Sequence, residues 1–381
     1  MNALSRIARH RFTWPLVALV ALLVADTVKT STFLSVRVQD GHLFGGPIDI
    51  LRNGAPLLLV SLGMTLVIAT RGIDLSVGAV LAIAGAVACD MIASSGSPGS
   101  LGTVLTACAV ACAICIVLGF ANGFLVAVVG IQPIIATLIL MTAGRGIAML
   151  ITEGQITTVN SAPFAKIGGG FWFGVPAAVV IAGVIFGLVA VGTRRTALGV
   201  LVESVGINPE ASRLAGVRSM SILLAVYAAS GLFAAVAGLM VASNVHAADA
   251  NNAGLFIELD AILAVVLGGT LLNGGRFSLI GTLIGTLVIQ TLTISVTIQG
   301  ISGSVTPFFK ALVVIAVFLL QSPAARQRLR GRRPATGPRP GTAAPAGAVV
   351  TLPATGPGRP AEPSPEVDLR AGNAGAPQAR S

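Results

Sequence analysis

Apolar residues in this chain fall in long blocks separated by short polar breaks. Most blocks approach the roughly 20 residues that a helix needs to cross a bilayer. The pattern therefore predicts an all-α polytopic membrane protein with about 8–10 transmembrane helices, some of them broken or re-entrant. The blocks are Trp14–Val28, Ala55–Ala69, Leu75–Ile92, Leu101–Val129, Ile131–Ile151, Val175–Val191, Ser221–Ser243, Leu259–Leu272, Phe277–Val296 and Pro307–Leu320.

The positions of the basic residues predict how the chain is oriented. If the basic N-terminus lies in the cytoplasm, six crossings return Arg194 and Arg195 to that side, and ten return the Arg-rich segment that follows the last block. Eight crossings with two re-entrant segments satisfy the same rule, so the number of crossings stays open. We expect a multi-pass protein of the bacterial inner membrane, with residues 1–13 and the C-terminus in the cytoplasm and residues 14–322 as its transmembrane domain.

Composition excludes a soluble protein. Only 10% of the residues are charged and 54% are hydrophobic, whereas soluble domains average about 25% charged, and the mean hydropathy is +0.90. The net charge of +10 does not indicate nucleic-acid binding, because the basic residues cluster beside the apolar blocks, where membrane lipid is the partner.

The C-terminal segment has a different composition. Half of the chain's 20 prolines lie after residue 330, among Ala and Gly. Such a segment buries too little apolar surface to offset its conformational entropy. We predict that residues 323–381 form a disordered cytoplasmic tail, basic at first and then rich in Pro, Ala and Gly.

No ATP-binding motif is present in the sequence. A phosphate-binding loop ends in Gly-Lys-Ser or Gly-Lys-Thr, and none of the three lysines, Lys29, Lys166 and Lys310, follows a glycine. We therefore expect no enzyme activity and no cofactor in this chain. Any ATP and magnesium would be bound by a separate ATPase subunit.

The largest insert between apolar blocks, residues 193–218, carries the signals of a short capped helix. Asn208 suits the N-cap, Pro209 the first helical position, and Glu210 the positive end of the helix dipole. Gly216 can end the helix in a left-handed conformation. The local pattern fits an ordinary interfacial connector and a docking helix equally well.

Two acidic positions interrupt apolar blocks. An ionisable side chain is costly at membrane depth, so it is paired, at an interface or in a polar path. Asp74 lies between two blocks with Arg71 three residues before it, and we predict that the two form a pair. Glu258 and Asp260 precede the short apolar segment Ala261–Leu272. A helix N-terminus there favours carboxylates, and a gating role is equally consistent.

Four segments, in order, resemble the permease subunits of ribose-type ATP-binding-cassette sugar importers. They are Gly63–Gly78, Gln132–Leu138, Gly206–Gly216 and Glu258–Gly269. The resemblance extends over Trp14–Leu320. Three further segments resemble the galactofuranose importer permeases in particular: Gln39–Leu51, Met149–Gln155 and Ala248–Leu255.

This resemblance implies two permease chains, alike or related, on two ATPase subunits, which receive a monosaccharide from a periplasmic or lipid-anchored sugar-binding protein. It also implies that the segment around residues 206–216 is the coupling helix that enters a groove on the ATPase, with Gly206, Asn208, Pro209, Glu210, Arg213 and Gly216 as its residues. Arg71 departs from the family, which commonly has Gly there. That departure puts in doubt any role of Asp74 as an unpaired polar group.

The polar loop at residues 244–252 is most simply explained as a solvated loop, although its hydroxyl and amide groups could contact a sugar. Asn251 and Asn252 present both donors and acceptors to hydroxyl groups. His246 has only Asp249 near it, so no metal site is expected. The candidate path or gate comprises Arg71, Asp74, Ser76, Asn251, Asn252, Glu258 and Asp260.

An ion-coupled secondary transporter is the alternative class. Its broken helices would place Asp74 and Asp260 near the midplane as ion or proton sites. The capped helix and the family resemblance favour the ATP-driven importer.

Overall fold

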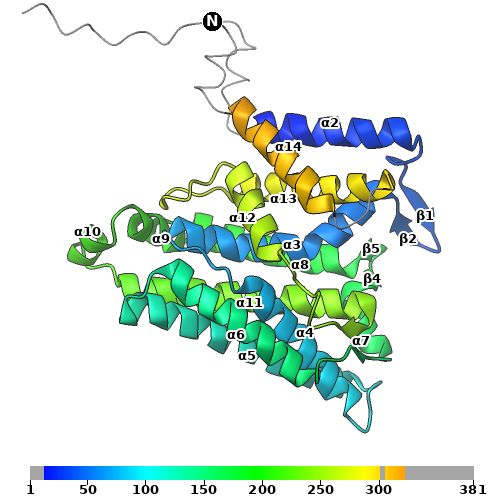
Figure 1. Cartoon of the computed structure of the whole chain (residues 1–381), viewed down its shortest axis with the longest axis horizontal. Helices are drawn as coiled ribbons and strands as arrows, with labels where there is room; N and C mark the ends of the chain where they lie inside the picture. Colours follow the sequence, from blue (N-terminus) through cyan, green and yellow to red (C-terminus); the bar gives the residue numbers. More distant parts are fainter. Residues whose placement is uncertain (1–12, 301–304, 322–381) are drawn as a thin grey trace, which may run out of the picture. The chain divides into compact units, whose positions relative to one another are not determined.

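A computed structural model describes residues 13–300 and 305–321 of the chain. The predicted tail at 323–381 and most of the predicted N-terminal segment at 1–13 lie outside the described residues. Within them the chain is a bundle of helices with three short two-stranded pairs, β1–β2, β3–β6 and β4–β5 (Figure 1).

All ten predicted apolar blocks are helices. They are α2 (Thr13–Lys29), α3 (Gly46–Ala69), α4 (Val77–Ala93), α5 (Leu101–Phe124) with a π-helical turn at Leu125–Val129, α6 (Pro133–Ile151), α8 (Ala177–Arg195), α11 (Ser219–Val245), α12 (Ile257–Leu267), α13 (Leu279–Ile298) and α14 (Thr306–Gln321). In the part of the chain that the structure describes, six are long and apolar enough to cross a membrane, namely α3, α5 with its π-helical turn, α6, α8, α11 and α13. The prediction of an all-α multi-pass membrane protein is confirmed.

Helix α3 begins at Gly46, well before the predicted start at Ala55. Asp49 and Arg52 lower the hydropathy of its first turns without breaking the helix. Pro47 suits the first turn, where its missing N–H has no helical partner. The predicted block Ala55–Ala69 therefore covered only the part of α3 that is buried almost throughout.

Helix α11 is packed against α3, α4 and α5. Small residues allow α11 to approach α5 closely, because a Cβ atom on Gly231 would lie 2.3 Å from the carbonyl oxygen of Cys115 and one on Gly119 would lie 2.4 Å from that of Tyr227. Cys115 is buried in this contact.

Helix α13 joins α3 to the group formed by α2, α12 and α14. Its polar side chains form hydrogen bonds between helices: the hydroxyl groups of Thr65 and Thr282 are 2.7 Å apart, and Ser295 donates to the buried carboxylate of Asp26 at 2.6 Å. Polar contacts of this kind hold helices together where apolar surface alone gives no preference over lipid.

The bundle has two distinct ends (Figure 1). One end, called the hairpin end below, carries β1 (Arg37–Gln39), β2 (His42–Phe44), α7 (Ala162–Gly168), β4 (Phe171–Trp172) and β5 (Val175–Pro176). There the N–H of Leu43 donates to the carbonyl of Gly174 at 2.9 Å, and the rings of His42 and Phe171 stack with centroids 4.4 Å apart. The other end, called the α10 end, carries α9 (Leu198–Ile207) and α10 (Pro209–Leu214).

Candidate functional site

The capped helix predicted in the insert is present as α10. The Oδ1 of Asn208 accepts the backbone N–H groups of Glu210 and Ala211 at 3.1 and 3.0 Å, so it serves as the N-cap. Gly216 has a left-handed φ of 87°. The N–H of Gly216 bonds the carbonyl of Arg213, and the N–H of Val217 bonds that of Ser212, which is a Schellman ending.

The outer face of α10 is open to solvent. Glu210 and Arg213 form an ion pair of 2.7 Å in which both side chains are largely exposed. The hydrogen bond from Arg213 holds the pKa of the Glu210 carboxyl below its usual value. Leu214 is 80% exposed. The helix therefore presents both charge and apolar surface at the α10 end.

Helix α9 was not predicted. Its signal was available, because Leu198, Leu201, Val202 and Val205 follow the i, i+3, i+4, i+7 spacing of one helical face. Val202 and Val205 are buried. The helix leads directly into Asn208, so it fixes where α10 begins.

The end of α9 is pressed against the end of α3. A Cβ atom on Gly206 would lie 1.8 Å from the carbonyl oxygen of Ala69, and that oxygen accepts the N–H of Gly275 at 2.8 Å. The guanidinium of Arg71 donates to the carbonyls of Asn273, at 3.1 Å, and of Ile207. The chain segments that follow α3, α9 and α12 are thus joined at one place beside α10.

The predicted pair of Arg71 and Asp74 is wrong. Arg71 has a left-handed φ of 66°, so the helical turn that would bring residues three apart together is not formed. Its side chain contacts Asn273 and Ile207. Among the described residues, the ion pairs are those of Glu210 with Arg213 and of Asp260 with Lys310.

The Asp74 carboxylate is stabilised by hydroxyl groups and an N–H instead. Its Oδ1 accepts the hydroxyl of Ser76 at 2.6 Å and the N–H of the same residue at 3.0 Å, and its Oδ2 accepts the hydroxyl of Ser230 at 2.9 Å. The side-chain amide of Asn122 donates to the Ser76 oxygen at 2.8 Å. All four residues are buried. We call them, together with Tyr227, the Asp74 cluster.

Tyr227 is the most voluminous buried side chain of the cluster. Its hydroxyl group is buried, and no hydrogen-bond partner for it lies among the described residues. A Cβ atom on Gly72 would be 2.5 Å from that oxygen, so the turn after α3 rests against it. Asn122, Tyr227 and Ser230 were missed because they belong to α5 and α11. A lone amide inside an apolar block was the signal for Asn122.

A second polar site lies at the hairpin end, in the loop after α11. The Oδ1 of Asp249 accepts the N–H groups of Asn251 and Asn252 at 3.1 and 3.2 Å, and its Oδ2 accepts the Asn252 side-chain amide at 2.7 Å. The amide of Asn252 is therefore engaged within the loop. The side-chain hydrogen bond from Asn252 lowers the pKa of Asp249 from its usual range.

Arg145 of α6 holds the same loop from the other side. Its guanidinium donates to the carbonyls of Ala250 and Ala253 at 3.1 and 2.6 Å. Loop residues also pair with the chain after α6, because Ala247–Ala248 (β6) lies antiparallel to Thr157–Thr158 (β3). Hydrogen bonds to α6 and to the segment that follows α6 therefore hold the loop in position.

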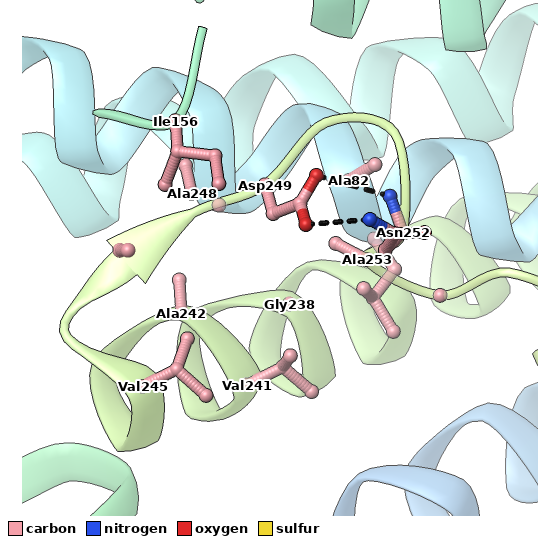
Figure 2. A pocket seen from close by; sticks show the side chains of 14 residues that line it. Ala82, Ile156, Gly238, Val241, Ala242, Val245, Ala248, Asp249, Asn252 and Ala253 are labelled. Carbon is pink, nitrogen blue, oxygen red and sulfur yellow. Dashed lines mark hydrogen bonds between the residues drawn. The ribbon is translucent and has the colours of Figure 1, made fainter. Parts of the chain in front are cut away.

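A cavity of about 400 Å³ lies behind this loop. Figure 2 shows it between α4, α11 and the loop, with Asp249 and Asn252 hydrogen-bonded to each other at its rim. Its other walls are apolar side chains, such as Val241, Val245 and Ile156. A polar solute loses hydrogen bonds in such a cavity. The apolar walls therefore do not favour tight binding of a polar ligand.

The remaining two predicted path residues are both on α12. Glu258 is buried, and its Oε2 is so near the start of α4 that a Cβ atom on Gly78 would lie 2.5 Å from it. Asp260 forms a part-buried ion pair with Lys310 of α14 at 2.5 Å. Lys310 was not among the predicted site residues. No group of three or more His, Cys, Asp or Glu side chains suited to a metal occurs within the described residues.

Residues 46–320 match the family described as "Branched-chain amino acid transport system / permease component". This segment covers well over half of the chain. The chain belongs to this permease family. No solved structure matches it.

Curated relatives share its length as well as its sequence. The galactofuranose transporter permease protein YtfT of Escherichia coli is 47% identical over 85% of this chain and 95% of its own. The fructose import permease protein FruF of Bifidobacterium longum is 42% identical over 84% and 90%. The ribose import permease protein RbsC of Escherichia coli is 35% identical over 81% and 92%. All three are named as transport permeases of sugars, in agreement with the family resemblance of the sequence motifs.

Proposed function

We propose that this chain is the membrane permease of an ATP-binding-cassette importer for a monosaccharide, with galactofuranose as the first substrate to test. The observation that carries the proposal is the 47% identity to a galactofuranose permease over nearly the whole of both chains. Fructose and ribose permeases follow at lower identity, so the substrate class rests on more than one relative.

The energy source is a separate ATPase that docks on α10. The capped helix and its exposed Leu214 supply a rigid, partly apolar contact at one end of the bundle. Arginines Arg194 and Arg195, at the end of α8, lie just before α9 and mark this end as cytoplasmic under the positive-inside rule. Both termini then lie in the cytoplasm of a cell whose inner membrane holds the chain.

The hairpin end faces a sugar-binding protein in this arrangement, and a second permease chain, identical or related, completes the path. The cavity lies behind the Asp249 loop, which hydrogen bonds hold in place. The Asp74 cluster lies deeper, where α3 gives way to α4. A sugar would meet the loop first.

The test is purification of the tagged chain from its native membrane, followed by identification of the subunits that accompany it. The complex is then reconstituted in liposomes with ATP inside, and uptake of labelled galactofuranose, fructose and ribose is measured. We expect an ATPase and a secreted binding protein to copurify, and one of the three sugars to accumulate only with ATP.

The family description favours a second candidate substrate class, branched-chain amino acids. Labelled leucine is therefore included in the same assay. Uptake of leucine without uptake of any sugar would replace the monosaccharide proposal. Uptake that needs an ion gradient and no ATP would contradict the importer mechanism itself.

A further inference from the structure

Arg71 joins three segments that lie far apart in the sequence. Its Nε donates to the carbonyl of Asn273, in the connection between α12 and α13, and its guanidinium also donates to the carbonyl of Ile207, the last residue of α9. Its own backbone continues from the end of α3, where its N–H bonds the carbonyl of Ile68 at 2.9 Å. A single side chain therefore connects the ends of α3, α9 and α12.

The position of Arg71 is conformationally demanding. Its φ of 66° is left-handed, a region that glycine occupies without strain and that a long side chain disfavours. The side chain is exposed, and its Cγ lies so near Gly274 that a Cβ atom there would be 2.3 Å from it. The two carbonyls that it reaches are the evident reason for an arginine here.

The acceptor at Ile207 directly precedes the N-cap of α10. Asn208 is the N-cap of that helix, so Arg71 is hydrogen-bonded to the residue directly before the start of α10. On the other side, Gly72 lies against the hydroxyl of Tyr227, and Asp74 follows two residues later. Arg71 thus stands between α10 and the Asp74 cluster, with one or two residues separating it from each.

We propose that Arg71 is a positioning residue that transmits movement of α10 to the break between α3 and α4. When the ATPase displaces α10, the end of α9 moves with it, and the two hydrogen bonds of Arg71 carry that displacement to the turn holding Asp74. This inference rests on the proposed function, because it assigns α10 to the ATPase. It adds the residue through which the coupling passes.

The experiment is the exchange Arg71→Gly in the reconstituted complex, with uptake of the transported sugar and ATP hydrolysis measured on the same vesicles. Glycine relieves the left-handed strain, so the variant should fold and retain its ATPase. We expect sugar uptake per ATP hydrolysed to fall at least about ten-fold, which is the size of effect from losing one charge-assisted hydrogen bond.

Two further variants separate coupling from structure. Arg71→Asn tolerates the left-handed backbone and cannot reach Ile207, so it should reproduce the loss even if the glycine variant does not reach the membrane. Arg276→Ala removes an exposed arginine from the same connection and should leave uptake per ATP unchanged.

Two results would overturn the inference. One is uptake per ATP at the wild-type value in Arg71→Gly and Arg71→Asn. The other is loss of the ATPase from the purified variants, which would make Arg71 a docking residue. If the unaltered complex shows no ATP-driven uptake, the proposed function fails, and that outcome is read from the wild type alone.

Discussion

A Cβ atom on Gly206 would lie 1.8 Å from the carbonyl oxygen of Ala69. Gly206 is the last residue but one of α9, and Ala69 is the last residue of α3. Their contact leaves no room for a side chain on Gly206. Because Ala69 contributes backbone rather than a movable side chain, the helices themselves would have to separate to admit a methyl group. The position of α10 on the bundle therefore depends on Gly206.

Gly206→Ala should detach the end of α9 from α3. We expect a loss of about 3 kcal/mol or more in the free energy of unfolding, at the upper end for overpacking, together with loss of ATP-driven uptake. Thermal unfolding in detergent and membrane abundance measure the effect. Gly192→Ala is the matched control, since a Cβ atom there meets nothing within 4 Å; equal behaviour of the two variants would disprove the close contact.

Asp74→Ala should destabilise the bundle more than Asp74→Asn. Alanine leaves the buried hydroxyls of Ser76 and Ser230 without their shared acceptor, at a cost of about 1–3 kcal/mol, whereas asparagine keeps one oxygen in place. The melting temperatures of the two variants in the same detergent decide the order. A larger loss for Asp74→Asn would contradict this assignment, because both variants lose the charge and only alanine loses both acceptor oxygens.

Asp74→Asn and Arg71→Gly should be additive in the free energy of unfolding. The two side chains share no partner, because Arg71 bonds carbonyls and Asp74 accepts from serines. Independent sites add within about 0.5 kcal/mol. A double-mutant cycle of thermal stability tests this. If one change rescued the other, the result would indicate an ion pair between Arg71 and Asp74, which is absent from the structure.

Lys310→Met should impair insertion more than the double change Lys310→Met with Asp260→Asn. The single change leaves the part-buried Asp260 without its partner, which is costly near lipid, while the double change removes both charges. Membrane abundance and uptake of the three proteins measure the coupling. If the double variant inserts normally and transports, Asp260 is also excluded as an obligatory ion site.

Leu214→Ser should weaken ATPase binding with little effect on the permease itself. The side chain is 80% exposed, so its removal should change stability by no more than about 0.5 kcal/mol. We expect less ATPase in the purified complex. Val38→Ser, which alters a side chain 71% exposed at the hairpin end, is the control and should retain the ATPase. Equal retention in both variants would remove Leu214 from the docking surface.

The loop after α11 should keep its conformation from neutral pH down to about the ordinary Asp pKa of 3.8. The hydrogen bond from Asn252 lowers the pKa of Asp249, so the stabilisation is present above the unfolded value and is lost as the pH falls through the lower folded value. A fluorophore on Asn251→Cys, read in detergent between pH 7 and pH 3, reports the transition. A change centred between pH 5 and pH 7 would contradict this assignment.

The sequence by itself determined the helices of the ten apolar blocks and the short capped helix α10. The length of an apolar block predicts a membrane helix almost without context. In lipid, a helix satisfies its backbone hydrogen bonds within its own segment and needs no partner from elsewhere in the chain. The ends of α10 were equally local, since Asn208, Pro209 and Gly216 act on backbone groups within a few residues of themselves. Even the missed α9 carried a local signal in the spacing of its valines and leucines.

Only the tertiary structure decided the partners of the charged residues. Spacing placed Arg71 beside Asp74, but a left-handed backbone at Arg71 redirected its side chain to Ile207 and Asn273. Asp74 found Ser230, and Asp260 found Lys310, on helices distant in the chain. A buried carboxylate is stabilised by the donors nearest to it in space. Which donors are near depends on how the helices pack, and the order of residues along the chain does not determine that packing by itself.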